Sequence, residues 1–166
     1  MASKYSSLIG ALAAVVVIIA LFVLLIVFGK PASSDTRTTQ EVAMSCTTDM
    51  ATEFHIHPHI AILVDGVSQV IPAEIGITNG CMHPLHTHET DGVIHVESPV
   101  VRDFTLSDFF AVWGKTFDRD HILDFVADET HVVTMTVNGT PSQDFEHLVL
   151  KDKDQIVISY DAVKTE

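Results

Sequence analysis

The chain has 166 residues and a formal net charge of −13, with 22 acidic residues against 9 Lys and Arg. All of the acidic residues follow residue 30, and the Lys and Arg residues are not clustered. Because a protein that grips a phosphate backbone needs clustered positive charge, the composition argues against nucleic acid and anionic membrane surfaces as partners.

The first predicted element is a transmembrane helix. Residues 8–28 carry no charge and are rich in Val, Ile, Leu and Ala; at about 1.5 Å per residue they span a hydrocarbon core of roughly 30 Å. The run exceeds the apolar region of a signal peptide, usually about 7–15 residues, so we predict an uncleaved anchor over residues 1–30. Lys4 precedes the apolar run and Lys30 follows it, so the positive-inside rule is nearly balanced. The strongly acidic chain after residue 30 then favours an orientation with the C-terminal domain outside the cytoplasm.

Two further segments follow the anchor. Residues 31–52 are rich in Ser, Thr and Asp and show little periodicity, which predicts a polar linker. Residues 53–166 are long enough for one hydrophobic core and are predicted to form a single extracytoplasmic domain.

Strand signals dominate the folded domain. Runs of β-branched residues are joined by Asp-Gly or Asn-Gly pairs, which favour two-residue hairpin turns. The predicted strands are a hairpin of 60–64 with 67–71, a short strand at 93–97, a hairpin of 131–137 that turns at 138–139, and a final strand at 155–160.

One helix is predicted after Thr105, because Asp108 three residues later completes a capping box. The elements together predict an α+β fold: a mixed or antiparallel sheet of five or six strands with one covering helix, β-grasp-like in order and preceded by one transmembrane helix. Apolar residues at helical spacing give this helix a face that packs in the core: Leu106, Phe109, Phe110, Trp113 and Phe117.

Histidines are concentrated in one part of the domain, and seven of the 10 lie between residues 55 and 95. Side chains two apart on an extended strand project from the same face. Two imidazoles so placed can bind one ion with bonds of about 2.0–2.1 Å. Pro58 predicts that the first group lies at an edge strand or a strand start; this group is His55, His57 and His59.

The second group lies around the segment HPLHTH. His86 and His88 are again two apart, His83 is nearby, and a turn at residues 91–92 leads to a strand on which His95 and Glu97 share a face. We predict that His86, His88 and His95 form a three-ligand metal site, with Glu97 as a fourth ligand or as a group that orients a histidine. A pH sensor and incidental polarity are the alternative interpretations of the cluster.

Imidazole ligands suit Zn, Cu, Ni and Fe, and the order of affinities favours copper, with zinc next. Met82 could assist Cu(I). Cys46 and Cys81 predict a disulfide, as expected for an even pair in an oxidising compartment. The alternative is that Cys81 is a thiolate ligand.

Four segments resemble an uncharacterised family of secreted or membrane-anchored bacterial and archaeal His-rich domains: FHIHPHIAILVDG, IPAEIGI, CMHPLHTHETDGVIHVESP and FTLSDFFAVWG. The resemblance covers residues 54–114 and, more faintly, the closing hairpin. It implies a common site, without a reaction, at the positions that recur in similar sequences: His55, His57, His59, Cys81, His86, His88 and His95.

These features predict a membrane-anchored extracytoplasmic protein that captures, buffers or delivers a transition metal at the outer membrane face. Its expected partners are the membrane, through the N-terminal helix, and a metal acceptor or membrane protein complex. Two alternatives remain: a metal-dependent enzyme whose three-His site activates water, or an accessory subunit of a membrane complex in which the histidines matter little.

Overall fold

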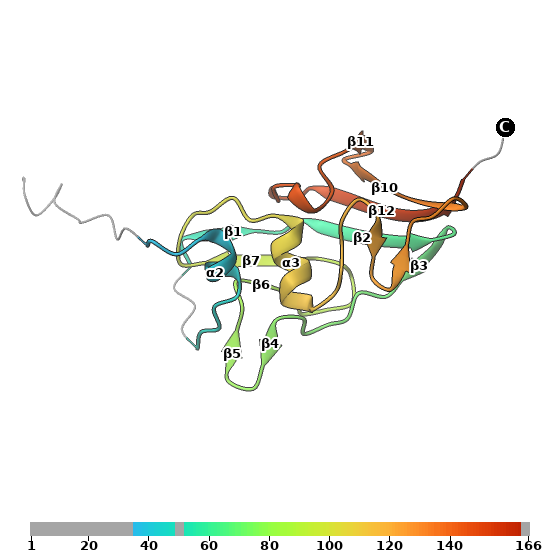
Figure 1. The fold of residues 1–166 in the computed structure, drawn as a ribbon. Helices are drawn as coiled ribbons and strands as arrows, with labels where there is room; N and C mark the ends of the chain where they lie inside the picture. The colour runs from blue at the N-terminus through green and yellow to red at the C-terminus, as the bar shows by residue number, and fades with distance from the viewer. Residues whose placement is uncertain (1–34, 49–51, 164–166) are drawn as a thin grey trace, which may run out of the picture. The chain divides into compact units, whose positions relative to one another are not determined.

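The computed structural model describes residues 35–48 and 52–163 (Figure 1). The chain divides into two compact units, residues 1–36 and 37–166, and every element described here belongs to the second. In chain order these elements are α2 (Thr39–Ala43), β1 (Phe54–Ile56), β2 (His59–Val64), β3 (Val67–Gln69), β4 (Ile77–Thr78), β5 (Cys81–Met82), β6 (Leu85–His86), β7 (His95–Ser98), α3 (Leu106–Trp113), β8 (His121–Ile122), β9 (Phe125–Val126), β10 (His131–Val137), β11 (Thr140–Ser142), the 3-10 helix η1 (Phe145–His147) and β12 (Gln155–Ala162).

The prediction of an α+β, β-grasp-like fold with a single sheet is wrong. Strand accounts for 39% of the described residues and helix for 13%. The strands divide into a five-stranded sheet of order β11-β10-β12-β2-β3, a three-stranded sheet of order β1-β7-β6, and the two-stranded pairs β4-β5 and β8-β9.

Pro58 is one physical reason for the division into separate sheets. It has no N–H to donate to a ladder, and it lies between the end of β1 at Ile56 and the start of β2 at His59. Consequently β1 pairs with β7, whereas β2 pairs with β12 in parallel and with β3 in an antiparallel hairpin.

Among the described residues, no helix has the length and apolar character needed to cross a membrane. The predicted transmembrane segment, residues 8–28, lies outside the described part of the chain.

Both predicted hairpins are confirmed, and their turns explain why. Asp65 and Gly66 have φ values of 48° and 75°, and Asn138 and Gly139 have 53° and 78°. Two successive residues with positive φ form the turn whose twist matches that of the flanking antiparallel strands.

The predicted helix is also confirmed, with its capping box. The backbone N–H of Thr105 donates to a carboxylate oxygen of Asp108 at 2.8 Å, and the helix ends at Gly114 in the left-handed conformation. Phe117 therefore lies beyond the helix, although it is buried in the same core as Phe109 and Phe110.

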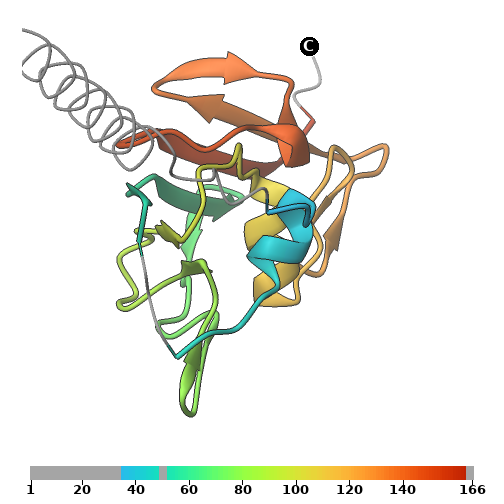
Figure 2. The ribbon, with the colours of Figure 1, turned by 90° about the vertical axis from the view of Figure 1, so that its left-hand side faces the viewer.

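Part of the segment predicted to be a polar linker belongs to the folded domain. Residues 39–43 form α2, which is capped by Thr38 and Glu41, and Val42 and Ala43 are fully buried. Thr38, one of the Ser and Thr residues on which the linker prediction rested, therefore caps a helix. Figures 1 and 2 show α2 beside α3, on the same side of the domain.

Gly76 allows a close approach between the chain and β6. Its φ is 72°, and a Cβ at this position would lie 2.5 Å from the carbonyl oxygen of Leu85 and 2.9 Å from a methyl carbon of Val112. Only glycine fits here without movement of the strand that ends in His86.

We expect Gly76→Ala to destabilise the domain more than Gly80→Ala. Gly80 also has a positive φ, 87°, but a Cβ there would have no atom within 4 Å. The left-handed backbone costs about 1–2 kcal/mol in either variant, and the clash adds about 1–3 kcal/mol at position 76 alone. Urea unfolding of the two variants measures the difference, and equal losses would contradict the close approach.

Candidate metal centre

The candidate centre lies on one face of the three-stranded sheet, and cross-strand register builds it. In this sheet β7 is the middle strand, with β1 on one side and β6 on the other. His55 lies opposite Glu97, and His86 lies opposite His95. Side chains directly opposite each other in an antiparallel pair share a face, so histidines from both neighbouring strands meet the side chains of β7.

The alternate positions of the same strands face the hydrophobic core. Ile56, Val96 and Leu85 lie opposite one another across the sheet, and none is more than 9% exposed. Burial of this apolar row determines which face carries the histidines, because successive side chains of a strand point to opposite faces.

His86 is held in a single tautomer by the backbone. Its side chain is fully buried, and its Nδ1 donates to the carbonyl oxygen of His83 at 2.9 Å. Because a carbonyl oxygen only accepts, Nδ1 carries the proton, and the Nε2 of the neutral ring keeps a free lone pair.

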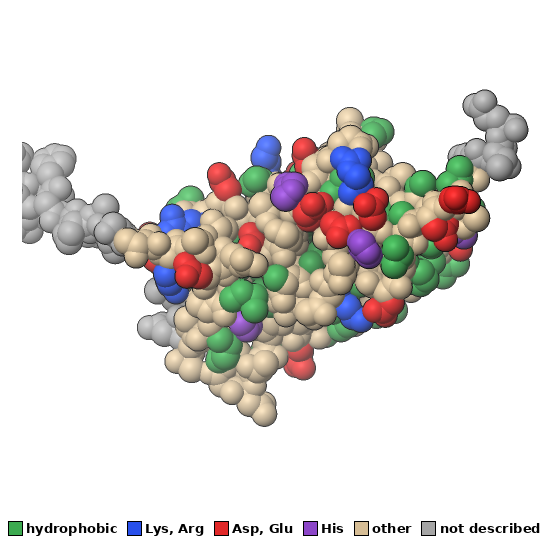
Figure 3. All heavy atoms as spheres, in the orientation of Figure 1, with side chains coloured by type: hydrophobic (Ala, Val, Ile, Leu, Met, Phe, Trp, Pro, Cys, Tyr) green, Lys and Arg blue, Asp and Glu red, His purple; other side chains and the backbone are tan. Residues whose placement is uncertain are grey.

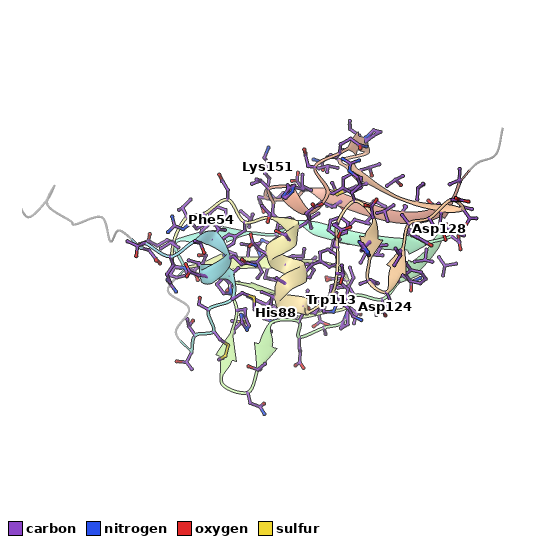
Figure 4. The ribbon with its side chains drawn as sticks, in the orientation of Figure 1. Phe54, His88, Trp113, Asp124, Asp128 and Lys151 are labelled. Atoms are coloured by element: carbon purple, nitrogen blue, oxygen red, sulfur yellow. A yellow bond between two sulfur atoms is a disulfide. The ribbon has the colours of Figure 1, made fainter. Side chains whose placement is uncertain are left out.

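That lone pair faces the imidazole of His88. The two Nε2 atoms are 3.2 Å apart, close to the separation of about 3.3 Å expected for two ligands of one tetrahedral ion with bonds of about 2.0–2.1 Å. His88 is exposed and follows β6 (labelled in Figure 4). The pair therefore combines one buried imidazole with one that is exposed to solvent.

His95 completes a first triad with this pair. Its ring stacks on that of His86, with centroids 5.5 Å apart, and lies 4.6 Å from that of His88. One ring nitrogen from each of the three histidines lies within 4.8 Å of the others. The Nδ1 of His95 is buried and makes no hydrogen bond to the described residues, which leaves that nitrogen without the partner that buried polar atoms normally have.

His55, His57 and His95 form a second triad with the same spacing, so His95 belongs to both. The Oε1 of Glu97 lies 3.1 Å from the Nε2 of His55 and 3.8 Å from the Nδ1 of His95. The structure thus shows two groups of histidines that could hold a metal ion.

Burial favours the neutral form of two of these histidines. It lowers the pKa of His86 from 6.5 to about 4, because the charged imidazolium loses its hydration. Burial also lowers the pKa of His95, and the neighbouring His88 and His57 add to the effect. Since only the neutral ring binds a metal, burial favours the form of both rings that can accept an ion.

Two predicted ligands are placed outside the triads. The Nε2 of His59 donates to the carbonyl oxygen of Asp91 at 2.8 Å, and His59 lines a separate cavity of about 190 Å³ beside Gly92. The Nδ1 of His83 donates to the carbonyl oxygen of Ala43 at 3.2 Å. Instead, the backbone carbonyl of His83 accepts the hydrogen bond from His86. A pattern of side chains in the sequence does not predict this backbone role.

The disulfide between Cys46 and Cys81 is confirmed, with Cα atoms 5.4 Å apart. Cys81 is therefore not a thiolate ligand in this structure. The disulfide links the segment after α2 to β5. Since β5 closely precedes β6, which carries His86, the disulfide lies near the candidate site along the chain.

Comparisons of the chain with protein-family models, with curated proteins and with solved structures give no match. The geometry of the histidine site is therefore the basis for inferring a function.

We expect the metal-free protein to lose stability as the pH falls from about 6.5 to about 4. Unfolded His86 takes up a proton near pH 6.5 and the folded form only near pH 4, so the unfolded chain binds more protons between these values and unfolding is favoured. The contribution of His86 to the free energy of unfolding is fully present above pH 6.5 and falls by about 3 kcal/mol between pH 6.5 and pH 4.

The variant His86→Asn provides the control for this prediction. Its amide can donate to the carbonyl of His83 but does not titrate. The free energy of unfolding, measured by urea titration at several pH values, should depend less steeply on pH in the variant. Identical slopes for the two proteins would show that His86 is not buried in its neutral form.

Proposed function

We propose that the domain is a transition-metal-binding module, and that His86, His88 and His95 hold the ion. The observation that carries the proposal is the arrangement of His86. Its backbone hydrogen bond through Nδ1 leaves the lone pair of Nε2 directed at the Nε2 of His88, from which it accepts a hydrogen bond at 3.2 Å and which an ion could replace. A buried ring with a defined tautomer costs little reorganisation when an ion binds.

Copper is the preferred ion in this proposal, and zinc is the next. The first triad consists of imidazoles alone, a ligand set that suits both. With the cysteines bonded to each other, no thiolate competes, and the general order of affinities then places Cu(II) above Zn(II).

The proposed task is to capture, buffer or deliver the metal at the outer membrane face. An exposed ligand such as His88 gives an acceptor a route to the ion. The net charge of −13 attracts cations, and Figure 3 shows acidic side chains spread over the visible face of the domain. The disulfide suits an oxidising compartment outside the cytoplasm, and the apolar run 8–28 is the proposed membrane anchor.

Metal titration of the untagged full-length protein tests the proposal. After chelator treatment, the protein is titrated with Cu(II) and with Zn(II) in competition with a chromophoric chelator of known affinity. We expect His88→Ala to weaken binding by about 100-fold or more, because loss of a direct ligand exceeds the 10–100-fold cost of losing a group behind a ligand.

His147→Ala is the matched control, because this histidine is 83% exposed, its Nε2 lies 3.3 Å from a carboxylate oxygen of Glu146, and it belongs to neither triad. Its affinity should equal that of the unaltered protein. Equal affinities for the unaltered protein and His88→Ala would refute the proposed site. Tighter binding of zinc than of copper would overturn the preferred metal and leave the metal site intact.

A further inference from the structure

The two histidine triads lie on opposite sides of the same strand. β7 is the middle strand of its sheet and carries His95 and Glu97 two residues apart. On one side, β1 and the residue after it supply His55 and His57; on the other side, β6 and the segment after it supply His86 and His88. Five imidazoles and one carboxylate therefore form a continuous group across three strands.

The ring contacts continue without a gap from one side to the other. The ring of His55 lies 4.5 Å from that of His57, and the ring of His57 lies 4.8 Å from that of His95. His95 in turn lies against His86 and His88. This group has more donor atoms than one ion needs, because a tetrahedral ion takes four ligands.

His95 cannot serve both triads as a neutral ring. A neutral imidazole has one nitrogen lone pair, and the other nitrogen carries the proton. When His95 binds the ion of the first triad, the second triad needs another ligand. Glu97 meets this need, since its Oε1 lies 3.1 Å from the Nε2 of His55.

Charge also favours a carboxylate at this position. Two divalent ions on neighbouring sites repel each other, and neutral imidazoles do not offset the repulsion. The carboxylate of Glu97 is 19% exposed and lies close to both His55 and His95. The carboxylate of Asp152 accepts the backbone N–H of His57 at 3.0 Å, but it is paired with Lys153 at 3.6 Å, so Glu97 supplies the charge that offsets the repulsion.

We infer that His55, His57 and Glu97 bind a second divalent transition-metal ion beside the ion of the first triad, with His95 between the two. The inference rests on the proposed function of the first triad. Two imidazoles and one carboxylate form a ligand set that holds Zn²⁺ with one position open. Because none of His55, His57 and Glu97 is fully buried as His86 is, this second ion exchanges with the solvent more readily than the first.

Stoichiometry tests the inference. The untagged full-length protein is loaded with excess Zn(II), desalted, and measured by elemental analysis. We expect two ions in the unaltered protein, one in the double variant His55→Ala/His57→Ala, one in His88→Ala and two in the His147→Ala control. Glu97→Gln should lower the affinity for the second ion while the first ion stays bound, because it replaces the carboxylate with a neutral amide. Thermal unfolding confirms that each variant is folded.

Electron paramagnetic resonance of the Cu(II)-loaded protein tests whether the two ions are neighbours. At two equivalents, neighbouring ions should give a spin-coupled signal, which the double variant should convert to that of an isolated ion. Two uncoupled signals would overturn the inference. So would two ions retained in the double variant.

The outcomes also separate the inference from the proposed function. One ion in the unaltered protein, lost in His88→Ala and kept in the double variant, would refute the second site and support the first. One ion whose affinity falls in both variants would show a single ion that draws on both triads, and would also refute the second site. No bound ion in the unaltered protein would overturn both proposals.

Discussion

Antiparallel register around β7 is the constraint on which the histidine cluster depends. The row formed by Ile56, Val96 and Leu85 is buried in the core, and the histidines occupy the alternate positions of the same strands. A slip of one residue in either pairing would move a histidine into the core row and an aliphatic side chain out of it. Burial of the apolar row therefore selects the register that brings the imidazoles together.

The fold also sets a gradient of burial across the cluster. His86 is fully buried beside Gly76 and the α3 residue Val112, His95 is half-buried, and His88 is exposed. The buried end carries an imidazole whose burial favours the neutral form and whose tautomer is fixed, and the exposed end gives access to solvent. Different residues of the same group thus suit the firm binding and the exchange that the proposed capture and delivery of a metal would need.

Backbone groups and short polar segments support this arrangement. The carbonyl of His83 sets the tautomer of His86, while the side chain of His83 bonds to the end of α2. The disulfide between Cys46 and Cys81 links β5 to the segment between α2 and β1. The segment that was predicted to be a linker thus helps to position β6, the strand that carries His86, although none of its side chains belongs to either triad.

Local interactions made part of this structure predictable from the sequence by itself. Turn pairs with positive φ defined both hairpins, the capping box defined α3, and HxH spacing placed rings on one face of an extended segment. The division of the described strands into four sheets, the pairing of β7 with β1, and the separation of His59 and His83 from the triads were decided only by the tertiary structure. The physical reason is that a strand's period of two is local, whereas its partners are chosen by burial shared among segments about 40 residues apart.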